Sequence, residues 1–351
     1  MPNHAAYLQA RYFPNLDGLR FICISMVLWH HAQPVPSGVF QLADRGFLGV
    51  DFFFVLSGYL ITTLLLREAD RDGKFSLRNF YIRRIIRIVP VYFFVVTSVA
   101  SYYGLVKGQP VGHLLPYYYL FLSNFLYEHI PTLTITWSLS VEEQFYMLWP
   151  AALLLVPHRF LPTALVGVIA INVLVGAGIL NIVGPHVGPL RIALPTATYA
   201  PILMGALAAM LLHKPNTFGA LARLLGGRLA ISLSLVALIM IIALTPADVN
   251  GWPNLAIHLA MTVTVIAMVL RTDGAISTML QNPLIRRIGV VSYGIYLYHL
   301  IGLDITMRVF GRIGFENEWA VLFAYSVVSY LIAEISFRTL EAYFRRFRPK
   351  S

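Results

Sequence analysis

The 351-residue chain is 58% hydrophobic, and only 12% of its residues carry a charge. An average soluble domain carries roughly 25% charged residues, so a soluble fold of this size could not bury so much apolar surface. The net charge of +10 could indicate a nucleic-acid-binding protein, but the cations lie between apolar stretches and form no basic arm with interleaved aromatic residues. The composition therefore predicts an integral protein of the lipid bilayer with no nucleic-acid partner.

Nothing in the sequence divides the chain into separate domains. It contains no linker rich in serine, glycine or proline, no low-complexity run and no repeat. We therefore expect residues 1–351 to form a single transmembrane domain with no appended soluble domain. Cys23 is the only cysteine, which excludes an intramolecular disulfide. Arg20 precedes the first apolar stretch and no small-x-small site follows it, so no cleaved signal peptide is expected.

Ten apolar stretches are long enough, or nearly long enough, to cross a bilayer as helices. They are residues 20–34, 47–66, 84–104, 137–156, 163–183, 195–212, 229–246, 255–270, 288–305 and 319–340. The shorter stretches need a tilt or the membrane interface to complete a crossing. The predicted fold class is therefore an all-α integral membrane protein with about ten transmembrane helices.

The basic residues predict how these helices are oriented. With the N-terminus in the cytoplasm and the stretches alternating, 21 of the 26 lysines and arginines lie on cytoplasmic segments and five lie outside. Cytoplasmic loops of membrane proteins carry such an excess of cations. The cytoplasmic set includes Arg11 near the N-terminus and Lys350 near the C-terminus, and both termini are predicted to be cytoplasmic.

Residues 113–126 (HLLPYYYLFLSNFL) form a further apolar run, which is compatible with the predicted orientation only if it does not cross the membrane. If the run crossed the membrane, every later segment would be inverted and the basic C-terminus would lie outside. We therefore expect a re-entrant segment or one that lies in the outer interface. Tyr117, Tyr118 and Tyr119 would suit an interface, where aromatic rings are enriched.

Charged or titratable groups inside a membrane span are costly, so each is a functional hypothesis. Arg20 and His31 are eleven residues apart on the first predicted helix. That spacing puts them on one face, about 16.5 Å apart along the axis, whereas His30 points about 100° away. The alternative is a snorkelling arginine and a histidine that caps the helix end.

Three more titratable residues lie at a similar depth on other predicted helices. Asp51, Glu142 and His299 each lie about five or six residues inside the outer end of their stretch. With His31 they predict one outer layer of two imidazoles and two carboxylates. A carboxylate that orients a histidine and stabilises its protonated form is typical of general-base catalysis. The alternative for each residue alone is a satisfied polar group in the core.

Two shorter patterns add candidates for a substrate pocket. Tyr296 and His299 are the candidates of the first pattern, because they follow Ser292 at spacings of four and seven residues and share one helix face with it. Ser57 and Gly58 interrupt an apolar run (FFVLSGYLI), where small residues allow close helix contact or leave room for a ligand.

Arg83, Arg84 and Arg87 form a cationic cluster at the predicted cytoplasmic end of the third stretch. Guanidinium groups bind phosphates bidentately, so the cluster could hold a phosphorylated ligand. The alternative is that the three residues only orient the helix and contact anionic lipids. The sequence has no zinc signature, P-loop, G-x-G-x-x-G or G-x-S-x-G motif, so no metal site is predicted.

These residues lie in motifs that resemble the family-3 transmembrane acyltransferases, which include O-antigen and exopolysaccharide O-acetyltransferases. The motifs are LDGLRFICISMVLWHH, GVDFFFVLSGYLI, NFYIRRIIRIVPVY, TWSLSVEEQFYMLWP and, more weakly, SYGIYLYHL. The first four lie within the first 150 residues, and the ten-span plan covers the whole chain. The resemblance implies that the residues matching Arg20 and His31 are essential. The frame V-E-x-Q-F-Y favours Glu142 over Glu143 as the matching glutamate, and its last residue, Tyr146, is a further candidate for the substrate pocket.

The resemblance also implies the reaction. The donor would be an acyl-CoA, usually acetyl-CoA, which binds from the cytoplasm as a substrate, so no permanently bound cofactor is expected. The acceptor would be a hydroxyl group, usually on a cell-surface carbohydrate, and the location would be the plasma (inner) membrane. Members often carry an extracytoplasmic hydrolase-like domain, so this chain would transfer the acyl group directly or pass it to a separate partner.

The resulting hypothesis is an acyl-CoA-dependent O-acyltransferase in which His31 is the general base, oriented by Glu142 or Asp51. An acyl-histidine intermediate is the alternative chemistry. Two other functions stay open at this point. One is an acyltransferase that acts on a lipid or a macrolide-like small molecule, and the other is a proton-coupled secondary transporter.

Overall fold

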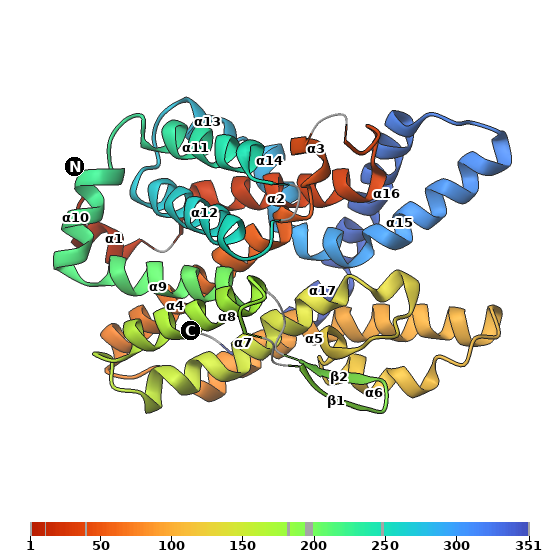
Figure 1. Cartoon of the computed structure of the whole chain (residues 1–351), viewed down its shortest axis with the longest axis horizontal. Coiled ribbons are helices and arrows are strands. Elements are labelled where there is room, and N and C mark those ends of the chain that lie inside the picture. Colours follow the sequence, from red (N-terminus) through yellow and green to blue (C-terminus); the bar gives the residue numbers. More distant parts are fainter. Residues whose placement is uncertain are drawn as a thin grey trace.

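The computed structural model describes residues 2–10, 12–38, 41–180, 183–193, 199–246 and 249–349 (Figure 1). The basic residues Arg11 and Lys350 of the orientation argument lie outside them. The helices and strands, in chain order, are α1 (His4–Gln9), α2 (Pro14–Ala32), α3 (Gln41–Asp44), α4 (Leu48–Asp72), α5 (Leu77–Ser101), α6 (Leu115–Tyr119), α7 (Thr136–Leu155), α8 (Leu161–Gly176), β1 (Val183–Val187), β2 (Leu190–Ala193), α9 (Ala200–His213), α10 (Pro215–Leu225), α11 (Ala230–Leu244), α12 (Trp252–Leu270), α13 (Ala275–Leu280), α14 (Pro283–Val290), α15 (Ser292–Ile313), α16 (Glu318–Arg338) and α17 (Leu340–Arg345).

A helix occupies most of each of the ten predicted stretches, namely α2, α4, α5, α7, α8, α9, α11, α12, α15 and α16. Within the described residues, four helical segments are long and apolar enough to cross a membrane. Two bent pairs, α10 with α11 and α14 with α15, raise this number to six if each pair is one span. The chain thus has membrane-spanning character, while the count of ten crossings remains a prediction.

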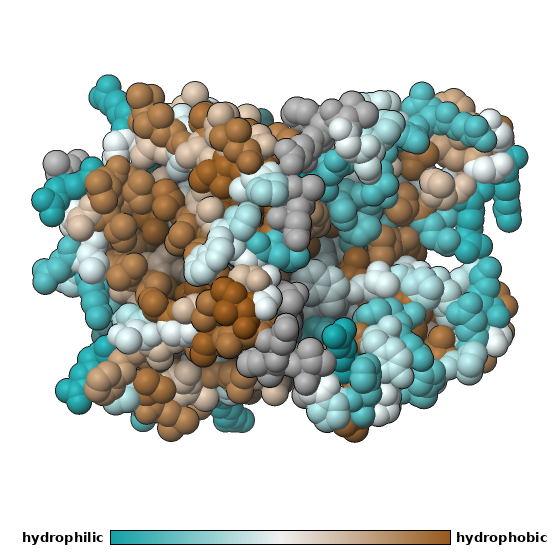
Figure 2. All heavy atoms as spheres, in the orientation of Figure 1, coloured by the Kyte–Doolittle hydropathy of each residue, from teal (hydrophilic) through white to brown (hydrophobic). Residues whose placement is uncertain are grey.

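The exposed surface supports the membrane assignment. Figure 2 shows a broad hydrophobic area over α8, α9, α11 and α12. Val168 of α8, Leu233 of α11 and Leu259 of α12 are large apolar side chains that are at least half exposed. Apolar side chains that cover this much surface are stable when lipid, rather than water, surrounds them.

Segments predicted to share one side of the membrane contact one another. On the predicted cytoplasmic side, His4 Nε2 lies 3.0 Å from the carbonyl oxygen of His213, so α1 packs near the end of α9. On the predicted outer side, the rings of Trp29 and Trp319 lie 5.5 Å apart. In Figure 1, α1 and α10 lie at one end of the molecule, and β1, β2 and the turn between α15 and α16 lie towards the other. Each of these two contacts joins segments that the predicted orientation places on one side, while the orientation itself remains a prediction.

The described fold is mainly helical, as predicted, with one local exception: residues 183–193 form an antiparallel hairpin of β1 and β2. The apolar stretch 163–183 ends its helix early, at Gly176, and the chain then continues through Gly184 and Pro185, which disfavour a helix. The two-residue turn begins at Gly188 with a φ of 58°, which suits glycine and the right-handed twist of a hairpin.

Residues 113–126 fold as short turns and α6 rather than as a long helix. The prediction for Tyr118 needs correction, because this side chain is buried in the core instead of lying in an interface. Its hydroxyl accepts a hydrogen bond from the Ile130 N–H at 3.0 Å, and its carbonyl accepts one from the Tyr92 hydroxyl at 3.0 Å. Tyr117 and Tyr119 remain partly exposed.

Glycines set the close approach of α4 and α9. A Cβ atom at Gly58 would collide with the carbonyl oxygen of Ile202, and one at Gly205 would collide with the carbonyl oxygen of Val55. The backbones of the two helices therefore touch, as small residues allow in membrane proteins. This contact fixes the rotation of α4 about its axis and with it the direction of Ser57.

Candidate active site

A cavity of about 100 Å³ lies between α2, α4, α5, α7, α14 and α15. Seven of the eleven predicted site residues line it: Arg20, Ser57, Arg84, Arg87, Glu142, Tyr146 and Tyr296. The four others, His31, Asp51, Arg83 and His299, lie outside its lining. Stretches that are far apart in sequence thus meet at one place inside the helical bundle.

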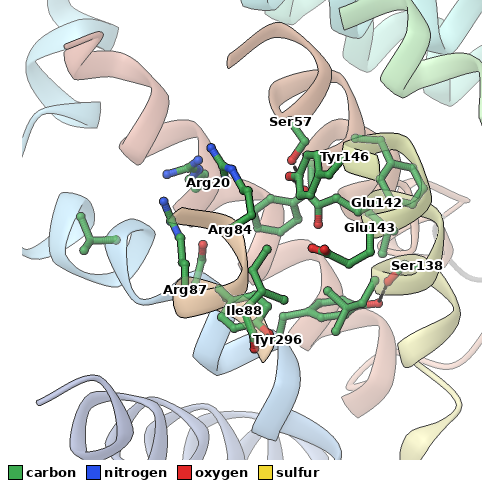
Figure 3. A pocket seen from close by; sticks show the side chains of 17 residues that line it. Arg20, Ser57, Arg84, Arg87, Ile88, Ser138, Glu142, Glu143, Tyr146 and Tyr296 are labelled. Carbon is green, nitrogen blue, oxygen red and sulfur yellow. Dashed lines mark hydrogen bonds between the residues drawn. The ribbon is translucent and has the colours of Figure 1, made fainter. Parts of the chain in front are cut away.

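The cavity has a cationic side and an acidic side. Figure 3 shows the guanidinium groups of Arg20, Arg84 and Arg87 gathered on one side, with Glu142 and Glu143 across from them. Three cations and two carboxylates inside the bundle are costly to bury unless they bind a polar ligand or one another. The cavity can therefore hold a charged or strongly polar group.

Each arginine of the cavity is held differently. Arg20 pairs with Asp17 at 3.4 Å, one turn earlier on α2, and Asp17 also accepts a hydrogen bond from Tyr12. Arg84 lies over the ring of Tyr146, with its Cζ atom 5.2 Å from the ring centroid. Arg87 makes no ion pair and no side-chain hydrogen bond within the part of the chain that the structure describes.

Glu142 is fixed by two neighbours. Its Oε1 atom accepts hydrogen bonds from the hydroxyls of Ser57 and Tyr146. Glu143 points into the cavity beside it (Figure 3) and has no side-chain hydrogen bond within the described residues. The structure thus gives the two adjacent glutamates different surroundings, with Glu142 held in a network and Glu143 left free.

His31 and His299 come together as a pair outside this cavity. Their ring centroids are 4.7 Å apart, and the rings lie edge to face. His31 Nδ1 lies 3.0 Å from the carbonyl oxygen of Val27. His299 is fully buried, and its Nε2 atom has no hydrogen-bond partner among the described residues. The ring of Tyr296, which lines the cavity, lies 5.4 Å from that of His299.

The predicted outer layer of four titratable residues does not form as one cluster. Asp51 Oδ2 lies 3.0 Å from Nε2 of His258 on α12, and Glu142 bonds Ser57, so neither carboxylate contacts His31. The reason is helical geometry. Asp51 and Ser57 are six residues apart on α4, so they point about 120° apart and face different neighbours.

The arginine cluster of α5 is also divided. Arg84 faces the first cavity, whereas Arg83 bonds Glu68 of α4 at 2.8 Å and lines a second cavity of about 190 Å³. Arg87 lines both cavities. Because one arginine belongs to both, the two cavities are neighbours.

His258 and Ser138 are two residues of these networks that the sequence did not predict. His258 lies inside the predicted stretch 255–270, where the rule for ionisable groups at membrane depth could have found it. Ser138, whose hydroxyl lies 2.7 Å from that of Tyr296, joins α7 to α15. A serine gives no comparable signal, because hydroxyl groups are common in membrane helices.

Comparison with known proteins identifies the family. Residues 13–337 match the family-3 acyltransferase domain. The peptidoglycan O-acetyltransferase OatA of Listeria monocytogenes is 28% identical over an alignment 377 positions long, which covers 97% of this chain and 58% of the relative. The O-acetyltransferase OatA of Staphylococcus aureus is 28% identical over an alignment 366 positions long, which covers 96% of this chain and 58% of the relative.

A putative O-acetyltransferase of Staphylococcus aureus is 29% identical, with 97% of this chain and 58% of the relative covered. The chain thus spans a little more than half the length of the curated relatives it matches. No solved structure matches the chain. Because the family domain covers nearly the whole sequence, the chain belongs to the family-3 acyltransferases.

Proposed function

We propose that this protein is a membrane-embedded O-acyltransferase that moves an acyl group, most simply acetyl, from cytoplasmic acyl-CoA to a hydroxyl of a carbohydrate outside the membrane. Family membership supports acyl transfer. The relatives named as O-acetyltransferases, one of them for peptidoglycan, support an acetyl group and a cell-wall polymer. The observation that carries the proposal is the buried cavity in which Arg20, Arg84 and Arg87 face Glu142.

The donor would enter from the side of the second cavity. Arg83 and Arg87 would bind phosphates of the CoA through their guanidinium groups. The pantetheine arm would pass Arg87 into the first cavity, run beside Arg20 and carry the thioester past Tyr296 towards His31. Glu142, held by hydrogen bonds from Ser57 and Tyr146, would keep the wall of that cavity in shape. Because acyl-CoA is consumed in the proposed reaction, it would be a substrate and not a resident cofactor.

His31 would be the general base. The carbonyl of Val27 can only accept a hydrogen bond, which assigns the ring proton to Nδ1 and leaves Nε2 as the proton acceptor. The acceptor hydroxyl would give its proton to Nε2, and its oxygen would attack the thioester carbonyl. The carbon–sulfur bond would then break, and the imidazolium would return the proton to the departing thiolate. His31 as an acylated nucleophile remains the alternative.

His299 and Asp51 would be positioning residues, which hold other groups in place rather than react with the substrate. The Nε2 atom of His299, which has no hydrogen-bond partner among the described residues, could accept a hydrogen bond from protonated His31 or from the hydroxyl of the carbohydrate substrate. Asp51 would hold α4 against α12 through its contact with His258. Tyr296 would separate the cavity from the histidine pair, so the acyl group has to pass this ring to reach His31.

The remaining parts of the proposal concern the membrane topology and the route of acyl transfer to the carbohydrate. They comprise ten crossings of the plasma membrane, cytoplasmic termini and either direct transfer or transfer to a separate extracytoplasmic partner. A lipid or small-molecule hydroxyl is the alternative acceptor. A proton-coupled transporter gains no support, since the family is one of acyltransferases.

The test is an assay of CoA thiol release by the purified protein, combined with mass spectrometry of surface glycans from cells with and without the gene. Acceptor-dependent thiol release and an acetyl mass on a glycan that appears only with the gene would support the proposal. Thiol release that no acceptor stimulates, together with identical glycans, would contradict it.

A further inference from the structure

The C-terminal end of the chain folds back onto α5. The short helix α17 packs against α5, and the two lie near each other in Figure 1. This contact brings Arg345 and Arg348 into the lining of the second cavity, together with Arg83 and Arg87 of α5. Four arginines from two distant parts of the sequence therefore surround one space of about 190 Å³.

The positive charge of this cavity is only partly balanced. Arg83 is paired with Glu68, and Arg345 donates a hydrogen bond of 2.6 Å to the carbonyl of Phe337 and stacks 3.9 Å above its ring. Arg87 and Arg348 make no ion pair and no side-chain hydrogen bond among residues that the structure describes.

Glu341 is the one carboxylate among the described residues that line the cavity. Partial burial, followed by the charges of Arg87 and Arg83, lowers the pKa of Arg348, which lies beyond the last helix. Cations that repel one another around a cavity are stabilised by an anion with several charges.

We propose that Arg345 and Arg348 complete the donor site by binding the 3′-phosphate of CoA. The inference rests on the proposed function and follows from the order of groups in the donor. The thioester and pantetheine arm come first, then the pyrophosphate, and the ribose 3′-phosphate lies farthest from the thioester. Arg87 lies where the two cavities join, so it meets the pyrophosphate, whereas Arg345 and Arg348 line only the far cavity.

An anionic lipid headgroup has the same phosphate chemistry and could also reach this side of the membrane. A binding experiment can distinguish the phosphate of CoA from that of a lipid headgroup. Only a site for the 3′-phosphate distinguishes CoA from 3′-dephospho-CoA, because the two ligands are otherwise identical.

The test measures equilibrium binding of CoA and of 3′-dephospho-CoA to the full chain in nanodiscs of phosphatidylcholine. Arg348→Ala is the main variant, because this side chain has no hydrogen-bond or ion-pair partner among the described residues whose loss would disturb folding. Arg345→Gln is the second variant. Arg346→Ala is the matched control, since Arg346 is exposed and lies outside the lining of the cavity.

The unchanged chain and the control should bind CoA about tenfold more tightly than 3′-dephospho-CoA, as expected for one lost charge-assisted contact. Arg348→Ala and Arg345→Gln should bind both ligands about equally. Arg87→Ala should weaken the binding of both by a similar factor.

If Arg348→Ala and Arg345→Gln both kept the full preference for CoA over 3′-dephospho-CoA, the inference would be overturned. The proposal that acyl-CoA is the donor would still stand. Failure of the unchanged chain to bind CoA at all would instead contradict the proposed function. A third result would assign the cavity to lipid and also overturn the inference. In that case Arg348→Ala and Arg345→Gln would lose co-purified phosphatidylglycerol but still bind CoA more tightly than 3′-dephospho-CoA.

Discussion

His31 of α2 and His299 of α15 lie edge to face, with their ring centroids 4.7 Å apart. Arg20, on the same face of α2 as His31, lines the charged cavity together with Ser292 and Tyr296 of α15. The helices α2 and α15 therefore contribute both to the lining of the cavity and to the histidine pair. About 16.5 Å separates Arg20 from His31 along the axis, a distance that a pantetheine arm has to cover in part.

The role of His31 can be tested against its neighbour in sequence. His31→Ala should lower the rate of acyl transfer by about 10²–10⁴-fold, as the loss of a general base does. His30→Ala should keep most of the activity, because the His30 ring packs on Phe47 and the side of the His31 ring, whereas His31 is the ring that packs on His299. Rates are to be measured as CoA thiol release at matched expression. Equal rates for the His31 variant and the parent would remove the proposed base.

The two adjacent glutamates differ in their surroundings and should differ in their importance. Glu142→Gln disturbs the oxygen that accepts from Ser57 and Tyr146, so it should lower activity by roughly tenfold to a hundredfold. Glu143→Gln keeps the same size in the same cavity and should cost less, because it removes no hydrogen bond within the described residues. A larger loss in the Glu143 variant would reverse the assignment.

The Asp51–His258 contact should contribute to stability more than to chemistry. Asp51→Ala leaves the buried Nε2 of His258 without its partner, which costs about 1–3 kcal/mol of folding free energy. The melting temperature of the purified protein should fall, while the rate per folded molecule stays close to that of the parent. Asp304→Ala, which breaks an exposed pair with Arg308, is the control and should not change the melting temperature. A catalytic Asp51 would produce the opposite pattern, a lost rate without lost stability.

The predicted orientation can be tested by labelling. Single cysteines at Lys74, between α4 and α5, and at Glu316, between α15 and α16, are exposed positions in a background that lacks Cys23. Glu316 is preferred to the neighbouring Asn317, whose side chain caps α16. An impermeant maleimide should label intact cells only at position 316. Labelling at position 74 from outside would invert the topology.

Much of this arrangement could be predicted from the sequence, because apolar runs and helix faces are local properties. Each predicted stretch contains a helix, and Arg20 and His31 do share a face, since one helix fixes both. The hairpin after Gly176 was missed, because an apolar run alone does not distinguish a helix from a short strand.

The partners of the site residues could not be predicted, because they depend on how one helix is rotated against another. Asp51 faces His258 rather than His31 because the contacts of Gly58 and Gly205 fix the rotation of α4. Arg345 of α17 and Arg348, which follows that helix, could not be predicted as site residues for the same reason, since only the folded chain brings them to Arg83 and Arg87 of α5.

The central claim, acyl transfer across the membrane, is tested most directly in inside-out membrane vesicles. Radiolabelled acetyl-CoA is added outside, where the cytoplasmic face is exposed, and an impermeant peptidoglycan oligosaccharide is enclosed. The account predicts label on the enclosed oligosaccharide and free CoA in the medium, with both lost in His31→Ala. Label that appears only when donor and acceptor are on the same side would contradict it.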